Sequence, residues 1–435
     1  MRVVVGSSIA ALVLVDLLSK HEQVIWAKRD GGIGGVFGGV ETKFGRLDIG
    51  MTNLELGDLT SSPVDSPLVE YSRESTNSCR NHLGLVRQYV EQYCVLKQLP
   101  EPQMFYRDSV LADFLYGHRL DVVNFFSFDE RILSCLKSVP TNLHPSLKYL
   151  TGTALERIPY IELCKQTFGE HFTNTLIVPW MKKLGVIDVE EIMSIDHRIV
   201  WAPLYYPESL VRAITEKEFD IGLKSFFSAP HDSTLASQIQ SIFQELTTRE
   251  NVVLREINSV NIDFVNNLIS DDAISDVYIA DRIQGIQTQP KQTKIDLVYF
   301  LMSETYAEFD YVLNSPSSET PWYRLTRVSI LDDGTSIVCG EFAENAIFES
   351  PTAESLGLGR HVADFGAAEV KRLSNINALN LPDSDWDATY ELLLKGIRNS
   401  TGKINVLGPG ASRWRNTFSD QVIQAHKTFG EIYEL

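Results

Sequence analysis

The sequence has little cysteine, and none of it forms a recognisable motif. Five cysteines are spread over 435 residues, as Cys79, Cys94, Cys135, Cys164 and Cys339. Their number is odd and no two of them have CxxC spacing, so we predict neither a disulfide framework nor a thiolate zinc site. Free thiols fit a reducing compartment, and the expected location is the cytoplasm.

Basic residues are also scarce. Lysine and arginine total 39 against 57 aspartates and glutamates, which gives a net charge of −18. The basic runs are pairs, such as Lys28-Arg29 and Lys182-Lys183. Nucleic-acid binding needs clustered lysine and arginine, so we expect no nucleic-acid partner. An anionic ligand would have to be held locally, by backbone N–H groups and a few arginines.

Long apolar runs are missing as well. The run from Val3 to Val15 is shorter than the ~20 residues of a bilayer-spanning helix, and Gly6-Ser7-Ser8 interrupts it. No small-residue cleavage site follows before the charged segment Lys20–Glu22, so neither a membrane span nor an export signal is expected. Hydrophobic residues still make up 44% of the chain, which is ample for a globular core.

The first thirty residues predict a strand, a helix and a second strand. Arg2–Val5 is a β-branched run typical of a buried strand, and Ile9–Leu18 is apolar on nearly every face, as in a helix packed between layers. Gln23–Ala27 is a second short strand. This order and length are typical of a dinucleotide-binding βαβ unit.

The turn of this unit carries an altered glycine fingerprint. Gly6, Ser8 and Ala11 occupy the three positions of GxGxxG, where Gly6 allows the tight turn and alanine is tolerated at the third position. Ser8 differs from the pattern, because its Cβ narrows the approach of a diphosphate. Its hydroxyl has two possible roles, to cap the helix or to contact the phosphate.

A glycine-rich segment follows the second strand. Residues 30–39 hold six of the 27 glycines and interleave them with Ile33, Val36 and Phe37. Flexible linkers are rich in serine and do not interleave such residues, whereas dense glycine suits a backbone that approaches a ligand closely. Ligand contact is the favoured interpretation, and a linker is the alternative.

Two stretches here resemble a known group of proteins. Residues 28–35 and 45–50 are similar to the "E-x-R-x-x-x-G-G … D-x-G" signature of the FAD-dependent clan of amine oxidases, protoporphyrinogen oxidases and UDP-galactopyranose mutases. The resemblance implies that Gly34-Gly35 lie against the FAD diphosphate and that Met51, Thr52 and Asn53 approach the flavin. The ribose-binding acid of the family is replaced by Ala27, and an arginine after the glycine pair by Val36.

Later segments continue the resemblance. A helix over Leu235–Leu246 and strands over Asn251–Val260 and Asp276–Ala280 match the order of the family, which implies an adenine contact at the backbone of Ile257. An ordinary α/β repeat is the alternative. The residues around Arg324 resemble a mutase stretch whose arginine approaches flavin and substrate; a solvated arginine at a strand edge is equally compatible with the pattern.

The C-terminus resembles the closing motif of the clan. A buried strand over Ile404–Gly410 precedes a helix over Phe418–Ala425, with Ser419 or Asp420 placed as its N-cap. The resemblance implies that Gly408 and the helix N-terminus hold the flavin and its ribityl phosphate. The tyrosines with which the mutases hold a sugar-nucleotide diphosphate are absent from residues 414–418, although Arg413 and Arg324 are suited to pairing with a diphosphate or carboxylate.

These observations predict an α/β protein in which a Rossmann-like FAD-binding domain is interleaved with a mixed helical and antiparallel-sheet substrate domain. The FAD-binding domain is expected over residues 1–70, 225–290 and 400–435, and the substrate domain over 71–224 and 291–399. The predicted cofactor-binding residues are Gly6, Ser7, Ser8, Ala11, Arg29, Gly34, Gly35, Val36, Met51, Thr52, Ile257, Gly408, Asp420, Gln421 and Val422; the predicted substrate-binding residues are Asn53, Arg324 and Arg413.

The predicted function is that of an FAD-dependent oxidoreductase acting on a small polar substrate such as an amine, an amino acid or a sugar nucleotide. A mutase-like sugar-nucleotide isomerase is the runner-up, and a degenerate binding protein of the same fold is an alternative motivated by Ser8, Ala27 and Val36. A nicotinamide-dependent dehydrogenase is disfavoured, because nicotinamide-binding domains are usually contiguous, whereas cofactor-like segments return here near residues 235–280 and 404–425. We predict no metal, the sequence identifies no catalytic base, and a homodimer is left open.

Overall fold

The computed structural model describes fifteen stretches of the chain. They are residues 1–50, 54–57, 83–106, 109–112, 130–142, 158–186, 188–194, 225–284, 292–302, 311–317, 320–344, 369–380, 384–401, 404–410 and 417–433.

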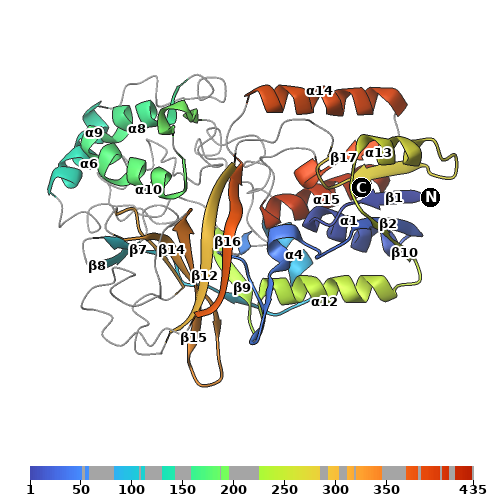
Figure 1. Cartoon of the computed structure of the whole chain (residues 1–435), viewed down its shortest axis with the longest axis horizontal. Coiled ribbons are helices and arrows are strands. Elements are labelled where there is room, and N and C mark those ends of the chain that lie inside the picture. Colours follow the sequence, from blue (N-terminus) through green and yellow to red (C-terminus); the bar gives the residue numbers. More distant parts are fainter. Residues whose placement is uncertain are drawn as a thin grey trace.

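A five-stranded parallel sheet lies on one side of the molecule, at the right of Figure 1. Its order is β10-β2-β1-β11-β17, so segments far apart in the sequence are neighbours in space. Val5 at the end of β1 stands opposite both Ala27 and Ile279, which sets the register of the three central strands. The strands are β1 (Arg2–Val5), β2 (Val24–Arg29), β10 (Val252–Ile257), β11 (Asp276–Ile279) and β17 (Ile404–Val406).

Helices cover both faces of this sheet. On one face, α1 buries ten of its eleven residues against the sheet and the surrounding helices. Side chains of β1 and β2 alternate between the faces, because successive residues of a strand point in opposite directions: Val4 and Trp26 pack toward α1, and Val5 and Ala27 toward α13 and α14. The helices are α1 (Ile9–Ser19), α4 (Leu83–Val90), α12 (Leu235–Thr248), α13 (Ile262–Ile269), α14 (Ser384–Thr401) and α15 (Phe418–Tyr433).

A second, larger sheet has seven strands in the order β16-β12-β15-β14-β13-β7-β8, and all its pairings are antiparallel except that of β13 with β7. A hairpin at Asp332-Asp333-Gly334 joins β14 to β15, with Gly334 at φ +83°. The strands are β7 (Gln103–Tyr106), β8 (Ser109–Ala112), β12 (Gln292–Met302), β13 (Val312–Asn314), β14 (Trp322–Ile330), β15 (Ser336–Ala343) and β16 (Glu369–Asn380).

A group of helices packs on this second sheet, at the left of Figure 1, through a core that contains Trp180 and Tyr323. These are α6 (Glu130–Asn142), α8 (Tyr160–Phe168), α9 (Glu170–Phe172), α10 (Val178–Lys183) and the short turns η3 (Thr173–Ile177) and η4 (Val189–Glu191). Two small sheets complete the described fold: β3 (Val40–Thr42) with β4 (Gly45–Leu47), and β5 (Leu54–Gly57) with β9 (Ser225–Pro230) and β6 (Leu96–Gln98).

The predicted α/β class is therefore confirmed, with a parallel and a mainly antiparallel sheet and helices on both. The parallel sheet draws its strands from residues 2–29, 252–279 and 404–406. The domain boundaries themselves stay a prediction. Within the described residues, no helix combines the length and the apolar character needed to cross a membrane.

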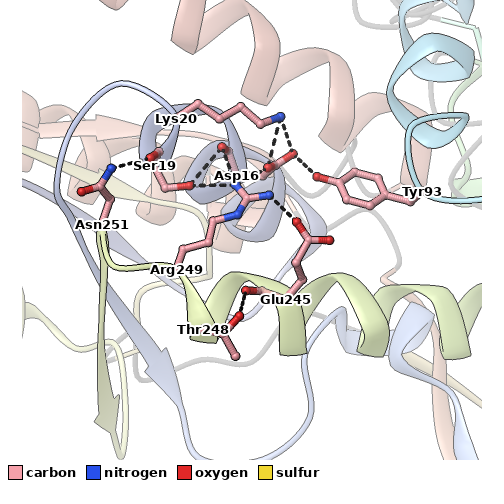
Figure 2. Close-up of polar contacts among 8 residues, drawn as sticks. All are labelled: Asp16, Ser19, Lys20, Tyr93, Glu245, Thr248, Arg249 and Asn251. Carbon is pink, nitrogen blue, oxygen red and sulfur yellow. Dashed lines mark hydrogen bonds and ion pairs between the residues drawn. The ribbon is translucent and has the colours of Figure 1, made fainter.

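The C-terminal end of α1 carries a fully buried carboxylate. Asp16 lies 2.7 Å from Nη1 of Arg249, accepts a hydrogen bond of 2.6 Å from the Tyr93 hydroxyl, and is also reached by Nζ of Lys20 (Figure 2). Arg249 in turn pairs with Glu245 on α12. Burial and the nearby carboxylate raise the pKa of Tyr93, so its hydroxyl stays a donor. The cluster ties α1 to the end of α12 and to the turn after α4.

Replacing Asp16 tests this tie. In Asp16→Ala, Arg249 and Tyr93 lose a buried partner while Arg249 keeps Glu245, so we expect the free energy of unfolding to fall by about 1.5–3 kcal/mol in urea denaturation. Lys20→Ala is the matched control, because it removes a partner of the same carboxylate whose side chain is 41% exposed, and it should cost under ~1 kcal/mol. Equal losses for the two variants would contradict this assignment.

Candidate functional site

The turn between β1 and α1 is possible only with glycine at its first position. Gly6 has φ +133°, and a Cβ there would lie 2.8 Å from the Asp281 side chain. The Gly6 N–H donates to the Ala27 carbonyl at 2.9 Å, and the Trp26 indole N–H donates to the Gly6 carbonyl at 2.9 Å. The turn is therefore held against the end of β2.

The two serines of the turn hydrogen-bond within the protein. Ser8 is the N-cap of α1: its Oγ accepts from the Ala11 N–H at 3.4 Å and donates to the Ala280 carbonyl at 3.0 Å. Of the two roles that we considered for this hydroxyl, capping is the one the structure shows. Ser7 Oγ accepts from the Arg29 N–H at 3.0 Å and so joins the turn to β2.

A buried carboxylate lies on this turn. Asp281 is 4% exposed and follows β11 by two residues. Its Oδ1 accepts from the Ser8 N–H at 3.1 Å, and its Oδ2 lies 2.9 Å from Nε of Arg29. Sequence reasoning missed this residue. The available signal was an acidic residue just after a strand of the parallel sheet, where ligands of such folds bind.

The glycine-rich segment packs against the same turn. The Gly34 N–H donates to the Ser7 carbonyl at 2.7 Å, and Gly34 and Gly35 have φ +90° and +59°. A Cβ on Gly34 would lie 3.1 Å from the Gly38 nitrogen and 3.2 Å from Ile239 of α12. The segment is thus fitted between the turn and α12, which rules out a free linker. Val36, in the short helix η1 (Gly35–Gly38), is 54% exposed.

The C-terminal glycine turn meets α1 from another side. Gly408 begins the short helix η8 (Gly408–Gly410) at φ +57°, and a Cβ there would lie 2.8 Å from Cβ of Ala10. The Ala10 N–H donates to Oε1 of Gln421 at 3.2 Å, and the Gly408 N–H donates to Oε1 of Gln424 at 2.6 Å. The start of α15 is therefore joined to the start of α1.

The predicted N-cap of α15 is wrong by two or three residues. The helix begins at Phe418, and Oγ1 of Thr417 accepts from the Asp420 N–H at 3.1 Å while donating to its carboxylate at 2.8 Å. Thr417 is thus the capping residue, because the helix starts two or three residues earlier than a cap at Ser419 or Asp420 would place it. Val422 is fully buried in the core around α1.

Ile257 is the last residue of β10 and stands opposite Arg29 in the sheet. Its carbonyl accepts from the Asp30 N–H at 3.1 Å. The structure thus brings together, at the carboxyl edge of the parallel sheet, the segments around Gly6, Gly34 and Gly408 that sequence reasoning had grouped. The roles of these residues toward a cofactor stay predictions, and Met51, Thr52, Asn53 and Arg413 lie outside the described residues.

A second polar cluster lies in the larger sheet. Arg324 on β14 is 1% exposed and pairs with Glu341 on β15 through two contacts, Nε–Oε1 at 2.6 Å and Nη2–Oε2 at 2.7 Å. The Tyr323 hydroxyl donates to the same carboxylate at 2.5 Å. Because β14 lies between β13 and β15, the alternative of a solvated strand-edge arginine is wrong.

This ion pair lies beside Gly50, the last described residue before Met51, Thr52 and Asn53, which were predicted to face the flavin. Gly50 has φ +64°, and a Cβ there would lie 3.0 Å from Oε1 of Glu341. Just before it, the Asp48 carboxylate accepts from the Leu235 and Ala236 N–H groups at 3.2 and 2.7 Å. Asp48 therefore fixes the start of α12, and the chain leaves Gly50 next to the Arg324–Glu341 pair.

Lys183, among the described residues, has a strongly lowered pKa. Its Nζ donates to Oγ1 of Thr320 at 2.6 Å and to the carbonyls of Ser315 and Trp322 at 3.1 and 2.9 Å. Burial lowers the pKa of Lys183 from 10.5 to about 7. Within the described residues, no group of three His, Cys, Asp or Glu side chains is arranged to hold a metal ion.

Comparison with known proteins supports the fold. No family model matches the sequence, and no curated protein is detectably similar to it. Among solved structures, reduced UDP-galactopyranose mutase matches with TM-score 0.64 at 14% identity, over 100% of this chain and 95% of that one. Cyclohexylamine oxidase from Brevibacterium oxydans matches with TM-score 0.54 at 12% identity, over 100% and 98% of the two chains.

Putrescine oxidase bound to putrescine matches with TM-score 0.51 at 11% identity, over 100% of this chain and 99% of that one. At such identities the likeness concerns the fold alone. It extends over the whole chain and includes two of the three kinds of protein named from the motifs, the mutases and the amine oxidases. The fold implied by the resemblance to this flavoprotein clan is therefore confirmed.

The acidity of Lys183 predicts a pH dependence of stability. Between about pH 7 and 10.5 the unfolded chain binds a proton at this lysine that the folded chain does not, so stability should rise with pH across that window. Lys183→Met should remove this rise, measured as the free energy of unfolding in urea at several pH values. The exposed Lys182 gives the control Lys182→Met. An unchanged slope in Lys183→Met would refute the assignment.

Proposed function

We propose that this protein is a flavin-dependent enzyme that binds FAD at the carboxyl edge of the parallel sheet and acts on a small polar substrate. The observation that carries the proposal is the meeting of three glycine turns at that edge. Gly6, Gly34 and Gly408 come from distant parts of the chain, all have positive φ, and a Cβ on any of them would crowd a neighbour. Such close backbone approach suits a dinucleotide in a crevice outside the strand ends.

The larger sheet would supply the substrate side. The Arg324–Glu341 pair lies against Gly50, and Met51, Thr52 and Asn53 follow directly, so we assign these residues to the flavin-facing part of the site. A bound flavin would supply the electron-transfer chemistry, and the protein would orient the substrate against it. The substrate class stays open between an amine, an amino acid and a sugar nucleotide. Isomerisation of a sugar nucleotide is the second choice, supported by the likeness to the mutase.

The backbone at the turn between β1 and α1 suits FAD, but the charges at this turn do not. Helix α1 presents its N-terminus at the turn, as an anion site requires. One of the donors there, the Ser8 N–H, is already engaged by an anion, the Asp281 carboxylate. At the end of β2, Ala27 and Lys28 offer no acceptor for a ribose hydroxyl. FAD would fit only after the Asp281 carboxylate has left the turn, and this observation favours the third candidate, a non-catalytic binding protein of the same fold.

The remaining expectations are consistent with an enzyme of this kind. The four cysteines within the described residues, Cys94, Cys135, Cys164 and Cys339, are free thiols. We propose a cytoplasmic protein whose partner is a small-molecule substrate rather than a nucleic acid, and a homodimer remains an open arrangement.

FAD titration tests the proposed function. Wild-type protein should bind FAD, seen as quenching of free FAD fluorescence and a protein-bound flavin spectrum. A side chain at φ +90° costs about 1–2 kcal/mol, and at Gly34 it would also press on Gly38. Gly34→Val should therefore weaken binding by about tenfold or more. Gly32→Ala is the control, because a Cβ there meets open space.

The opposite results would exclude the proposal. Protein that stays colourless with FAD, both as wild type and with the Asp281 carboxylate removed, cannot be a flavoenzyme. Equal FAD affinity in Gly34→Val and Gly32→Ala would place the diphosphate elsewhere.

A further inference from the structure

The dinucleotide turn of this protein contains its own anion. We propose that Asp281 is an intramolecular occupant of the diphosphate site, so that a dinucleotide binds only when this carboxylate is displaced and Arg29 is released to the ligand. The inference rests on the proposed function for the identity of the displaced ligand, FAD. The occupancy itself rests only on the geometry of the turn.

The first support is the place of the carboxylate. A Cβ added to Gly6 would lie 2.8 Å from both Cγ and Oδ1 of Asp281, so the carboxylate sits directly on the glycine backbone. The first glycine of such a turn allows the tight bend, and its missing Cβ also leaves room for a neighbouring group. Here the group that uses this space is the side chain at the end of the neighbouring strand.

The second support is that Asp281 makes the contacts of a bound phosphate. Its two oxygens take different partners: Oδ1 accepts from the Ser8 N–H at the start of α1, and Oδ2 pairs with Nε of Arg29 at the end of β2. The carboxylate thus spans the turn from the helix to the next strand. Backbone N–H groups at a helix N-terminus, together with a guanidinium, are the donors that hold a phosphate in proteins.

The next N–H groups of α1 also donate to side chains of the protein itself. The Ala10 N–H donates to the side-chain oxygen of Gln421, and the Ala11 N–H donates to Oγ of Ser8. Among the described contacts, Asp281 is the one ionised acceptor at this helix start. Because like charges repel strongly at a buried site, a diphosphate and the Asp281 carboxylate cannot share the turn.

The exposure of Arg29 explains how a ligand could take the place of the Asp281 carboxylate. Its side chain is 45% exposed whereas that of Asp281 is 5% exposed, so the guanidinium reaches the surface where a ligand would enter. Rotation of the Asp281 side chain would free both Arg29 and the Ser8 N–H. A diphosphate would then regain the two contacts that the carboxylate loses, which makes the exchange one anion for another.

The test removes the carboxylate and asks whether a free anion replaces it. Asp281→Ala should lower the melting temperature, and millimolar inorganic pyrophosphate or ADP should restore it by several degrees while leaving wild type nearly unchanged. FAD affinity, measured by fluorescence quenching, should rise about tenfold or more in the variant. Asp281→Asn, which keeps an acceptor for the Ser8 N–H but loses the charge, serves if the alanine variant does not fold, with the same expectations.

The matched control lies on the same strand. Asp276 pairs with Nε of Arg2 at 3.3 Å, so Asp276→Ala removes the same kind of ion pair from the opposite end of β11, away from the turn. It should gain neither pyrophosphate protection nor FAD affinity.

Two results would overturn the inference: equal pyrophosphate protection of wild type, Asp281→Ala and Asp276→Ala, or an Asp281→Ala variant that binds FAD no more tightly than a wild type that does bind it. A different set of results would distinguish failure of the proposed function from failure of this inference. If pyrophosphate protects Asp281→Ala selectively but no variant binds FAD, the occupancy by Asp281 stands and the flavoenzyme proposal fails.

Discussion

The rest of this structure depends on the burial of α1. Ten of the eleven residues of this helix are inside, between the parallel sheet and α4, α12 and α15. A helix so placed cannot satisfy the polar groups at its ends with water, and an unpaired buried donor or charge costs more than most contacts contribute. The protein therefore has to supply partners at both ends of α1 from other parts of the chain.

Each end carries a buried aspartate whose partners come from other elements, and at the C-terminal end Arg249 and Asn251 also donate to the carbonyls of Asp16 and Ser19. At the C-terminal end, Asp16 pairs with Arg249 and Tyr93 and thereby joins α12 and the turn after α4 to the helix (Figure 2). At the N-terminal end, Asp281 pairs with the Ser8 N–H and Arg29. Asp16 thus connects neighbouring elements at one end of α1. At the other end, Asp281 lies where this fold is suited to bind an anionic ligand.

Much of the fold was predictable from local patterns. The first strand is found at Arg2–Val5 as predicted, and α1, β11 and α12 differ from their predicted bounds by one or two residues, because periodicity and glycine turns are properties of short segments. The cap of α15 was misplaced because three polar candidates, Thr417, Ser419 and Asp420, lie within four residues at its start. Arg324 could be nominated from sequence, but its bidentate pairing with Glu341 depends on β14 and β15 being neighbours.

The sequence by itself determined the strands and helices that form the layers of this protein. Apolar residues recur with the periods of strands and helices, and glycines separate these segments where the backbone needs a positive φ. The sequence also determined which segments carry those glycines. The tertiary structure alone decided that Asp281, 275 positions after Gly6 in the numbering, fills the space left by the missing side chain of that glycine. Pairings across such distances arise from the order of strands in the sheet, and local sequence does not encode which side chain arrives at a given turn.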